Sequence, residues 1–242
     1  MIQRLFGRPA VIAVSILGCA LLTEAGSAPA IQTDLAGARD RQDLNALDGM
    51  IARAKQAAEA NPKSADAQYQ LALAYSYAAE VAMELHDKRK AAAYAEAGVD
   101  PARKAVADED SNAEYHRLLG AVCGQVIPAN PLLGALSYGK CAQDEINRAI
   151  ELNKDLALAY VSRGVGDYYL PQQMGGGLAL ALQHLDKAIS LDPKLAEAYL
   201  WKGVVLRKSN RDAEARQAFE RALQLDPNRL WAKQQLQKTP AQ

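Results

Sequence analysis

The sequence predicts an all-α protein in which helix hairpins stack into a solenoid. Half of the 242 residues are hydrophobic and Ala is the commonest of them, whereas only 2 Phe and 2 Trp occur. Ala has the highest helix propensity, and its small side chain lets helices pack closely. The chain contains no strand-like runs of Val, Ile and Thr, and a pattern of small residues recurs along it. Such a recurrence is typical of repeat proteins.

The recurring pattern has two parts. The first helix of each predicted pair carries one small residue, namely Ala72, Gly120, Gly164 or Gly203, and the second helix closes on Ala followed by an Asn/Asp-Pro-like ending. Only small side chains allow the two helices to approach closely, so we expect Gly203 to face Ala215 across the last pair. The predicted units are residues 65–110, 113–154, 157–193 and 196–227.

The units shorten along the chain. Their endings lie 48, 44, 39 and 34 residues apart. The first unit is longer than the 34-residue spacing of the last one, and its additional residues contain neither Gly nor Pro where they lengthen the hairpin. The N-terminal hairpins are therefore predicted to be long. Gly98 and Pro101 interrupt the second helix of the first unit, where we expect a kink or a restart. In the third unit the surplus lies within the segment 168–177. Tyr168 and Tyr169 are predicted to end the first helix, and Pro171 and three consecutive Gly are predicted to form the loop that leads to the second.

The last unit resembles a known repeat. The segment 196–229 carries the tetratricopeptide (TPR) signature, with Pro227 ending its second helix; the matching residues are Tyr199, Gly203, Leu206, Ala215, Phe219 and Ala222. The resemblance covers roughly residues 45 to 237. It implies a right-handed αα-solenoid of about four hairpins, whose first helices line a concave, partner-binding face.

A narrower resemblance concerns the lengthened hairpins and their loops. A divergent branch of this repeat family is similar in four features: the hairpin lengths, the segment AEAGVDPARKAV at 95–106, the Pro-containing loop at 126–131 and the Gly-Gly loop at 175–177. That branch includes the T component of tripartite periplasmic transporters and the regulators of microtubule dynamics. The resemblance implies an alternative role as an accessory subunit of solute uptake, which would bind a substrate-binding protein or a small ligand.

Segments outside the four units are predicted to cap the stack. Residues 41–62 form an N-terminal capping helix, and residues 230–242 form a C-terminal capping helix and tail, because the end repeats would otherwise expose apolar faces. Residues 31–40 are predicted to be a disordered linker.

The first thirty residues have the order of a secretory signal peptide. Two Arg precede an uncharged apolar run at 10–22, and Ala28-Pro29-Ala30 offers a cleavage site. The mature chain is then expected to begin near Ile31 in the periplasm or cell envelope of a bacterium. Two alternatives stay open: lipidation at Cys19, which lies in a lipobox-like sequence, or an uncleaved anchor.

The predicted binding groove is rich in Tyr and Arg, residue types enriched at binding hot spots. We expect it to bind a protein or peptide partner, although some of the Tyr could instead pack within the hairpins. The resemblance to the TPR family places the concave face on fixed positions of each first helix, and the groove residues that it implies here are Tyr69, Leu73, Tyr77, Arg117, Gln125, Tyr168, Tyr169, Leu200, Arg207 and Lys208.

The sequence does not support catalysis. His86, His116 and His184 are scattered, and no metalloprotease, nucleophile-elbow or phosphate-loop motif occurs. We therefore expect no enzyme activity, no cofactor and no metal. The formal net charge is zero, which offers no electrostatic reason for nucleic-acid binding. Membrane attachment is expected only if Cys19 is lipidated.

The remaining two cysteines lie in one unit. Cys123 and Cys141 fall on the two antiparallel helices of the second pair. A disulfide between them and two buried free thiols both remain open.

Overall fold

The structure, a computed structural model, describes residues 28–128 and 131–240, and within these ranges it contains helices and no strand. The predicted all-α solenoid is confirmed. The helices are α1 (Ala28–Asp40), α2 (Leu44–Ala60), α3 (Ala65–Glu84), α4 (Lys88–Asp108), α5 (Ala113–Val126), α6 (Pro131–Leu152), α7 (Ala157–Tyr169), the 3-10 helix η1 (Gln172–Met174), α8 (Leu178–Leu191), α9 (Ala196–Lys208), α10 (Asp212–Leu225) and α11 (Leu230–Lys238).

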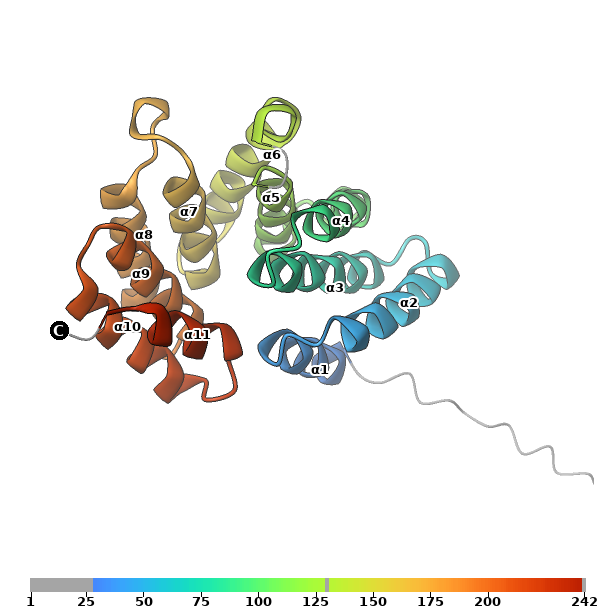
Figure 1. Cartoon of the computed structure of the whole chain (residues 1–242). Coiled ribbons are helices and arrows are strands. Elements are labelled where there is room, and N and C mark those ends of the chain that lie inside the picture. The colour runs from blue at the N-terminus through green and yellow to red at the C-terminus, as the bar shows by residue number, and fades with distance from the viewer. Residues whose placement is uncertain (1–27, 129–130, 241–242) are drawn as a thin grey trace, which may run out of the picture.

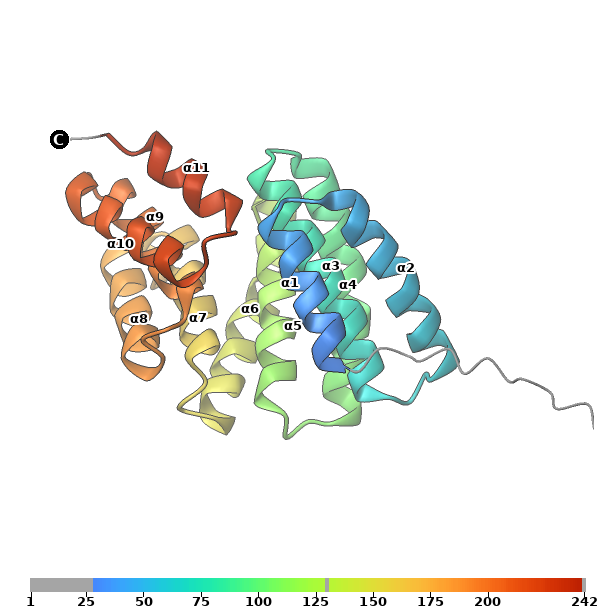
Figure 2. The same ribbon diagram turned by 90° about the horizontal axis from the view of Figure 1, so that it is seen from below.

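Four helix pairs follow one another along the chain: α3 with α4, α5 with α6, α7 with α8, and α9 with α10. The pairs curve around a common axis, so that the last helix, α11, comes to lie near α1 (Figure 1 and Figure 2). The first helices of successive pairs also contact one another, as α3 does with α5 and α7 with α9. The first helices therefore form the inner layer of a nearly closed ring.

Local sequence signals set several helix starts. Ser64 accepts a hydrogen bond from the backbone N–H of Ala67, and Asn112 accepts one from Glu114. These are N-cap bonds, which satisfy backbone donors that have no partner inside the helix. The expected restart at Pro101 is not observed, because α4 runs continuously through this residue. Pro101 is buried there.

The small residues of the pattern lie at the closest helix contacts. A Cβ atom at Gly164 would lie 2.9 Å from Leu185 Cγ, and one at Gly120 would lie 2.8 Å from Ile146 Cγ1. At Gly203 the nearest atoms belong to the Phe219 ring and not, as predicted, to Ala215. The reason is the size of the ring, which fills the space between α9 and α10.

The prediction of a disordered linker at 31–40 is wrong. The segment belongs to α1, and Leu35 and Ala38 are buried in the same hydrophobic cluster as residues of α3. Leu35 and Ala38 lie three residues apart and therefore share one face of the helix, which packs on α2 and α3. The predicted signal peptide lies outside the described residues, except for 28–30 in the first turn of α1. No helix in the described ranges is long and apolar enough to cross a membrane.

The loop after α7 forms a rim at the edge of the inner layer. Gly175 and Gly177 have φ angles of 85° and 110°, which favour glycine. A side chain at Gly176 would collide with the carbonyl oxygen of Leu170. The N–H of Gly177 donates to the carbonyl oxygen of Asp167 at 2.8 Å, which folds the rim back on the end of α7.

Candidate partner-binding face

Four of the predicted groove residues are not accessible on the concave side. The exposed fractions are 7% for Tyr69, 5% for Leu73, 9% for Arg117 and 1% for Leu200. Their assignment to the partner-binding surface is therefore corrected: they belong to the interior of the ring. The physical reason is the tight curvature, which brings neighbouring first helices and α1 onto these side chains.

Tyr69 and Arg117 share one carboxylate. The Tyr69 hydroxyl donates to Glu114 at 3.0 Å, and Arg117 Nε donates to the same side chain at 2.7 Å. The ring of Tyr69 lies 5.0 Å from that of Tyr115. Burial raises the pKa of Tyr69, so its hydroxyl stays protonated and keeps donating. This group joins α3 to α5 and has a structural role.

Other predicted groove residues have partners within the chain. The Ser76 hydroxyl donates to Gln125 Oε1 at 3.0 Å, and the Arg39 guanidinium lies 4.9 Å from the centre of the Tyr77 ring. Arg207 donates to the backbone carbonyl of Gln235 at 3.2 Å, which ties α9 to α11. Lys208 is exposed at the end of α9.

Aromatic side chains from three helices meet in what we call the aromatic cluster, which consists of Tyr168, Tyr169, Trp201 and Trp231. Ring centres are 6.1 Å apart for Tyr168 and Trp201, and 5.3 Å apart for Trp201 and Trp231. Tyr169 is 50% exposed, and Met174 of the adjoining rim is 65% exposed. Two members, Tyr168 and Tyr169, were predicted from sequence. The two Trp were missed, although an aromatic at the position after Leu200 is a signal that could have found one of them.

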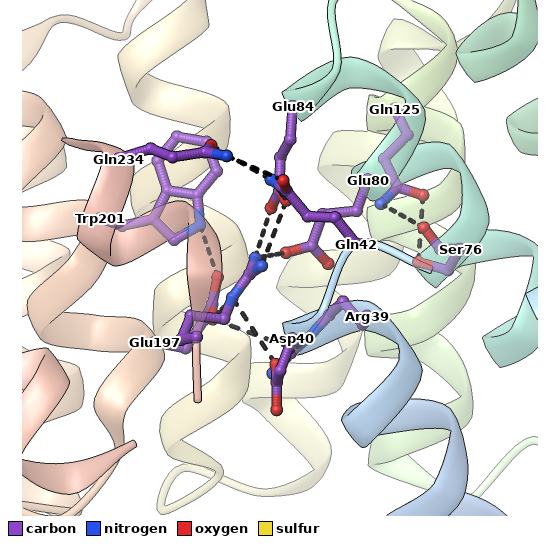
Figure 3. A network of polar contacts seen from close by, with 11 residues as sticks. Arg39, Asp40, Gln42, Ser76, Glu80, Glu84, Gln125, Glu197, Trp201 and Gln234 are labelled. Carbon is purple, nitrogen blue, oxygen red and sulfur yellow. Dashed lines mark hydrogen bonds and ion pairs between the residues drawn. The ribbon is translucent and has the colours of Figure 1, made fainter. Parts of the chain in front are cut away.

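A buried network of charges joins the first and last parts of the ring. Arg229, only 2% exposed, donates from Nη2 to Glu84 Oε1 at 2.5 Å and from Nη1 to Glu84 Oε2 at 3.2 Å. It also pairs with Glu80. Arg229 Nε lies 3.8 Å from both Asp40 Oδ1 and Glu197 Oε2. Figure 3 shows these four carboxylates converging from α1, α3 and α9.

Arg39 completes this network, which we call the latch: Arg39, Asp40, Glu80, Glu84, Glu197 and Arg229. Arg39 pairs with Asp40 at 2.8 Å and approaches Glu197 to 3.8 Å. Next to the latch, Gln234 Nε2 donates to Gln42 Oε1 at 2.9 Å, a contact between residues 192 positions apart (Figure 3). Apart from the neighbours Arg39 and Asp40, these pairings join residues far apart in the sequence, have no local sequence signal and were not predicted.

The latch borders both a cavity and the aromatic cluster. The cavity has a volume of about 230 Å³, and Arg39, Tyr77, Glu197 and Arg229 are among its lining residues. Trp201 Nε1 donates to Glu197 Oε1 at 3.0 Å, and the Arg229 guanidinium lies 5.6 Å from the centre of the Trp231 ring. The charge network therefore holds two rings of the cluster in place.

The latch makes stability depend on pH. Removal from water raises the pKa of Glu80 to about 8, and Arg229 and Arg39 oppose this only in part. Burial also raises the pKa of Glu84 and of Asp40. A carboxyl whose pKa is raised on folding stabilises the protein below its unfolded pKa of about 4.3, and this contribution is lost as the pH rises through the folded value.

We therefore expect the melting temperature to fall as the pH is raised from about 5 to about 9, because ionised Glu80 then faces Glu84 and Glu197. In a Glu80→Gln variant this side chain stays neutral, so the melting temperature should fall less over the same pH range. Thermal melts across this range measure the difference, with Glu151→Gln on the exposed side of α6 as the matched control. Parallel curves for the wild type and Glu80→Gln would contradict the prediction.

The described histidines join helices of the same pair or form a turn. His116 and Glu145 are 2.6 Å apart between α5 and α6, and His184 and Asp167 are 2.6 Å apart between α8 and α7. His86 has a φ of 62° in the turn after α3. In the described ranges no three His, Cys, Asp or Glu side chains are grouped so as to hold a metal ion.

Cys123 and Cys141 form a disulfide that joins α5 to α6. Their Cα atoms are 6.0 Å apart, and the bond closes a loop with a sequence separation of 18. Cys123 is fully buried. Of the two alternatives left open by the sequence, the structure contains the bonded form.

Paired helices with small residues at their contacts, arranged around an aromatic inner face, define a TPR-type αα-solenoid. The tetratricopeptide repeat model matches residues 196–229. The model described as "Regulator of microtubule dynamics protein 1-3" matches residues 36–170, more than half of the chain. The chain belongs to this family, which is one of the two members named for the divergent branch that its hairpins resemble. No curated protein matches the sequence significantly.

Two solved structures illustrate the fold. TTC0263, a thermophilic TPR protein of Thermus thermophilus, is 18% identical with a TM-score of 0.61, over 86% of this chain and 98% of that one. The HusA haemophore from Porphyromonas gingivalis is 18% identical with a TM-score of 0.57, over 85% of this chain and 95% of that one. At these identities the likeness concerns the fold alone. TPR proteins in general bind protein or peptide partners.

Proposed function

We propose that this chain is an exported, non-enzymatic adaptor that binds a peptide segment of a partner protein on its aromatic cluster. The observation that carries the proposal is the exposure of Tyr169 and Met174 beside Tyr168, Trp201 and Trp231, whose rings meet edge to face. Tyr and Trp provide large contact areas with few rotatable bonds, and exposed apolar side chains that gather in one place mark interaction sites. The partly buried Trp201 and Trp231 are held by the latch, so the surface is ordered before a partner arrives.

The order of the first thirty residues supports export. The disulfide between Cys123 and Cys141 is consistent with it, because disulfides persist in oxidising compartments such as the periplasm. Lipidation at Cys19 would place the same binding face at a membrane surface.

A second candidate role is an accessory subunit of a periplasmic solute-uptake system. The cavity of about 230 Å³ beside the latch favours it, because a small ligand could enter there, and so does the weaker resemblance to transporter T components. In this role the chain would bind a substrate-binding protein or a small ligand.

Site-specific photocrosslinking in intact cells tests the proposed function. A photoreactive phenylalanine analogue replaces Tyr169, or, as the matched control, Tyr199 on the outer part of α9, whose hydroxyl donates to the Pro193 carbonyl oxygen. We expect partner adducts at position 169 and none at 199. Adducts with varied partners support the adaptor, and a single substrate-binding protein supports the accessory role. No adduct at position 169, or equal adducts at both, overturns the proposed site.

A Trp201→Ala variant should weaken capture of the cross-linked partner by roughly tenfold or more, because the loss of a central aromatic typically removes about 2 kcal/mol of binding free energy. Tyr199→Ala serves as the control and should bind normally. The measurement is an affinity titration against the purified partner. Unchanged affinity for Trp201→Ala would show that the cluster does not form the contact.

A further inference from the structure

The seam between the first and last parts of the ring is polar. The buried hydrophobic cluster that contains α1 and α3 extends to α5, and the clusters of the C-terminal half include residues of α7 to α11. Within residues 28–128 and 131–240, none of these clusters includes buried residues from both α3 and α9. Across the seam, contact is made by the latch and by Gln42 with Gln234. The seam can therefore part without exposing a shared apolar core.

The N-terminal side of the seam presents three carboxylates, from Asp40, Glu80 and Glu84, which we call the carboxylate pocket. The guanidinium on the same side of the seam, that of Arg39, is paired with Asp40 of the pocket at 2.8 Å. In the closed ring the pocket receives Arg229 from the other side, with both oxygens of Glu84 engaged. Paired N–H donors that meet a carboxylate in this way select arginine over lysine.

The fit of Arg229 in this pocket is incomplete. Its Nε is buried and has no hydrogen-bond partner in the described part of the chain, and the nearest oxygens of Asp40 and Glu197 lie 3.8 Å away. An unpartnered buried donor is unfavourable. The four carboxyl groups of the latch also outnumber its two guanidinium groups. The structure thus shows a site built for a guanidinium, filled by a residue of the same chain with one donor left over.

We propose that the carboxylate pocket is an arginine-binding site for a partner segment, and that Arg229 occupies it in the closed ring as an internal competitor. An arginine of the partner displaces Arg229, and the seam opens; Trp201 keeps its hydrogen bond to Glu197 on the same helix. That a partner segment binds here rests on the peptide-binding role proposed above. That the segment binds through an arginine rests on the contacts of Asp40, Glu80 and Glu84.

The test uses the full chain and a peptide that copies its residues 226–234, with either arginine or glutamine at the position of Arg229. Arg229→Ala vacates the pocket, and we expect it to bind the arginine peptide at least about tenfold more tightly than the wild type does. The glutamine peptide should bind neither. Arg211→Ala, which removes an exposed arginine paired with Glu214, is the matched control and should behave as the wild type. Equal affinity of Arg229→Ala for the two peptides overturns the proposal, as does equal affinity of Arg229→Ala and wild type for the arginine peptide.

A second measurement decides the case if Arg229→Ala does not fold. The double variant Gln42→Cys, Gln234→Cys is joined by a short bis-maleimide, which locks the seam. Cys19→Ser removes one native cysteine, and the Cys123–Cys141 disulfide keeps the other two from reacting with the reagent. The locked protein should bind the arginine peptide at least about tenfold more weakly than the unjoined variant. Equal binding overturns the proposal. Failure of crosslinking at position 169 would overturn the proposed function alone, whereas failure of either peptide test overturns the arginine-binding pocket alone.

Discussion

Removing the disulfide is expected to lower the free energy of unfolding by about 3 kcal/mol, the value for a loop of this length in the chain-entropy model. The bond between Cys123 and Cys141 spans 18 residues and restricts the unfolded chain. It also joins α5 to α6 in the second pair, where the loop between the two helices is longer than in the last pair. For a chain of this size the melting temperature should fall by roughly 6–12 °C.

The measurement is a thermal melt of the wild type and of Cys123→Ala with Cys141→Ala, each with and without reductant. Reductant should lower the melting temperature of the wild type to that of the double variant and leave the double variant unchanged. If reductant has no effect on the wild type, the bond does not contribute to stability.

The second large effect is expected at Gly203. A Cβ atom there would lie 2.5 Å from Cε1 and 2.6 Å from Cδ1 of Phe219, whose ring is fully buried and cannot swing aside. The collision produced by Gly203→Ala should therefore lower the free energy of unfolding by about 2 kcal/mol, within the range for overpacked cores. The gain in helix propensity from Gly to Ala, about 1 kcal/mol, opposes this loss without cancelling it.

Gly166 provides the matched control. It also lies inside a first helix, α7, but beyond its chain neighbours and the adjacent helix backbone, no atom of the described residues lies within 4 Å of the position of its Cβ. Gly166→Ala should raise the free energy of unfolding by up to about 1 kcal/mol, which isolates the propensity term. Chemical denaturation compares the two variants. Adding Phe219→Leu to Gly203→Ala should cost less than the sum of the single changes, since the smaller side chain makes room; strict additivity would mean that the two residues do not collide.

The helices and their pairing were predictable because their signals are local. Each first helix needs a small residue where its partner crosses, and Gly120, Gly164 and Gly203 supply it. Capping residues such as Ser64 and Asn112 satisfy backbone donors within the next turn. The rim after α7 was equally readable from Pro171 and the glycines that follow it.

The accessible part of the binding face could not be read in the same way. The position of a residue within the repeat indicates that Tyr69 and Leu200 face inward. Whether that inward face is open or filled depends on how tightly the pairs curve and on what lies inside the curve. Here α1 lies inside it, held by Leu35 and Ala38, and the segment had too few apolar residues to predict a docked helix from sequence.

The sequence by itself determined the all-α solenoid, the four helix pairs and their decreasing length, because helix propensity, capping and close packing act over a few residues or one hairpin. The tertiary structure decided which aromatic side chains stay accessible and which charges meet. Arg229 and Glu84 are 145 residues apart, and no pattern near either one indicates the other. Their contact arises only when four pairs have added their rotations and brought the last helix back to the first.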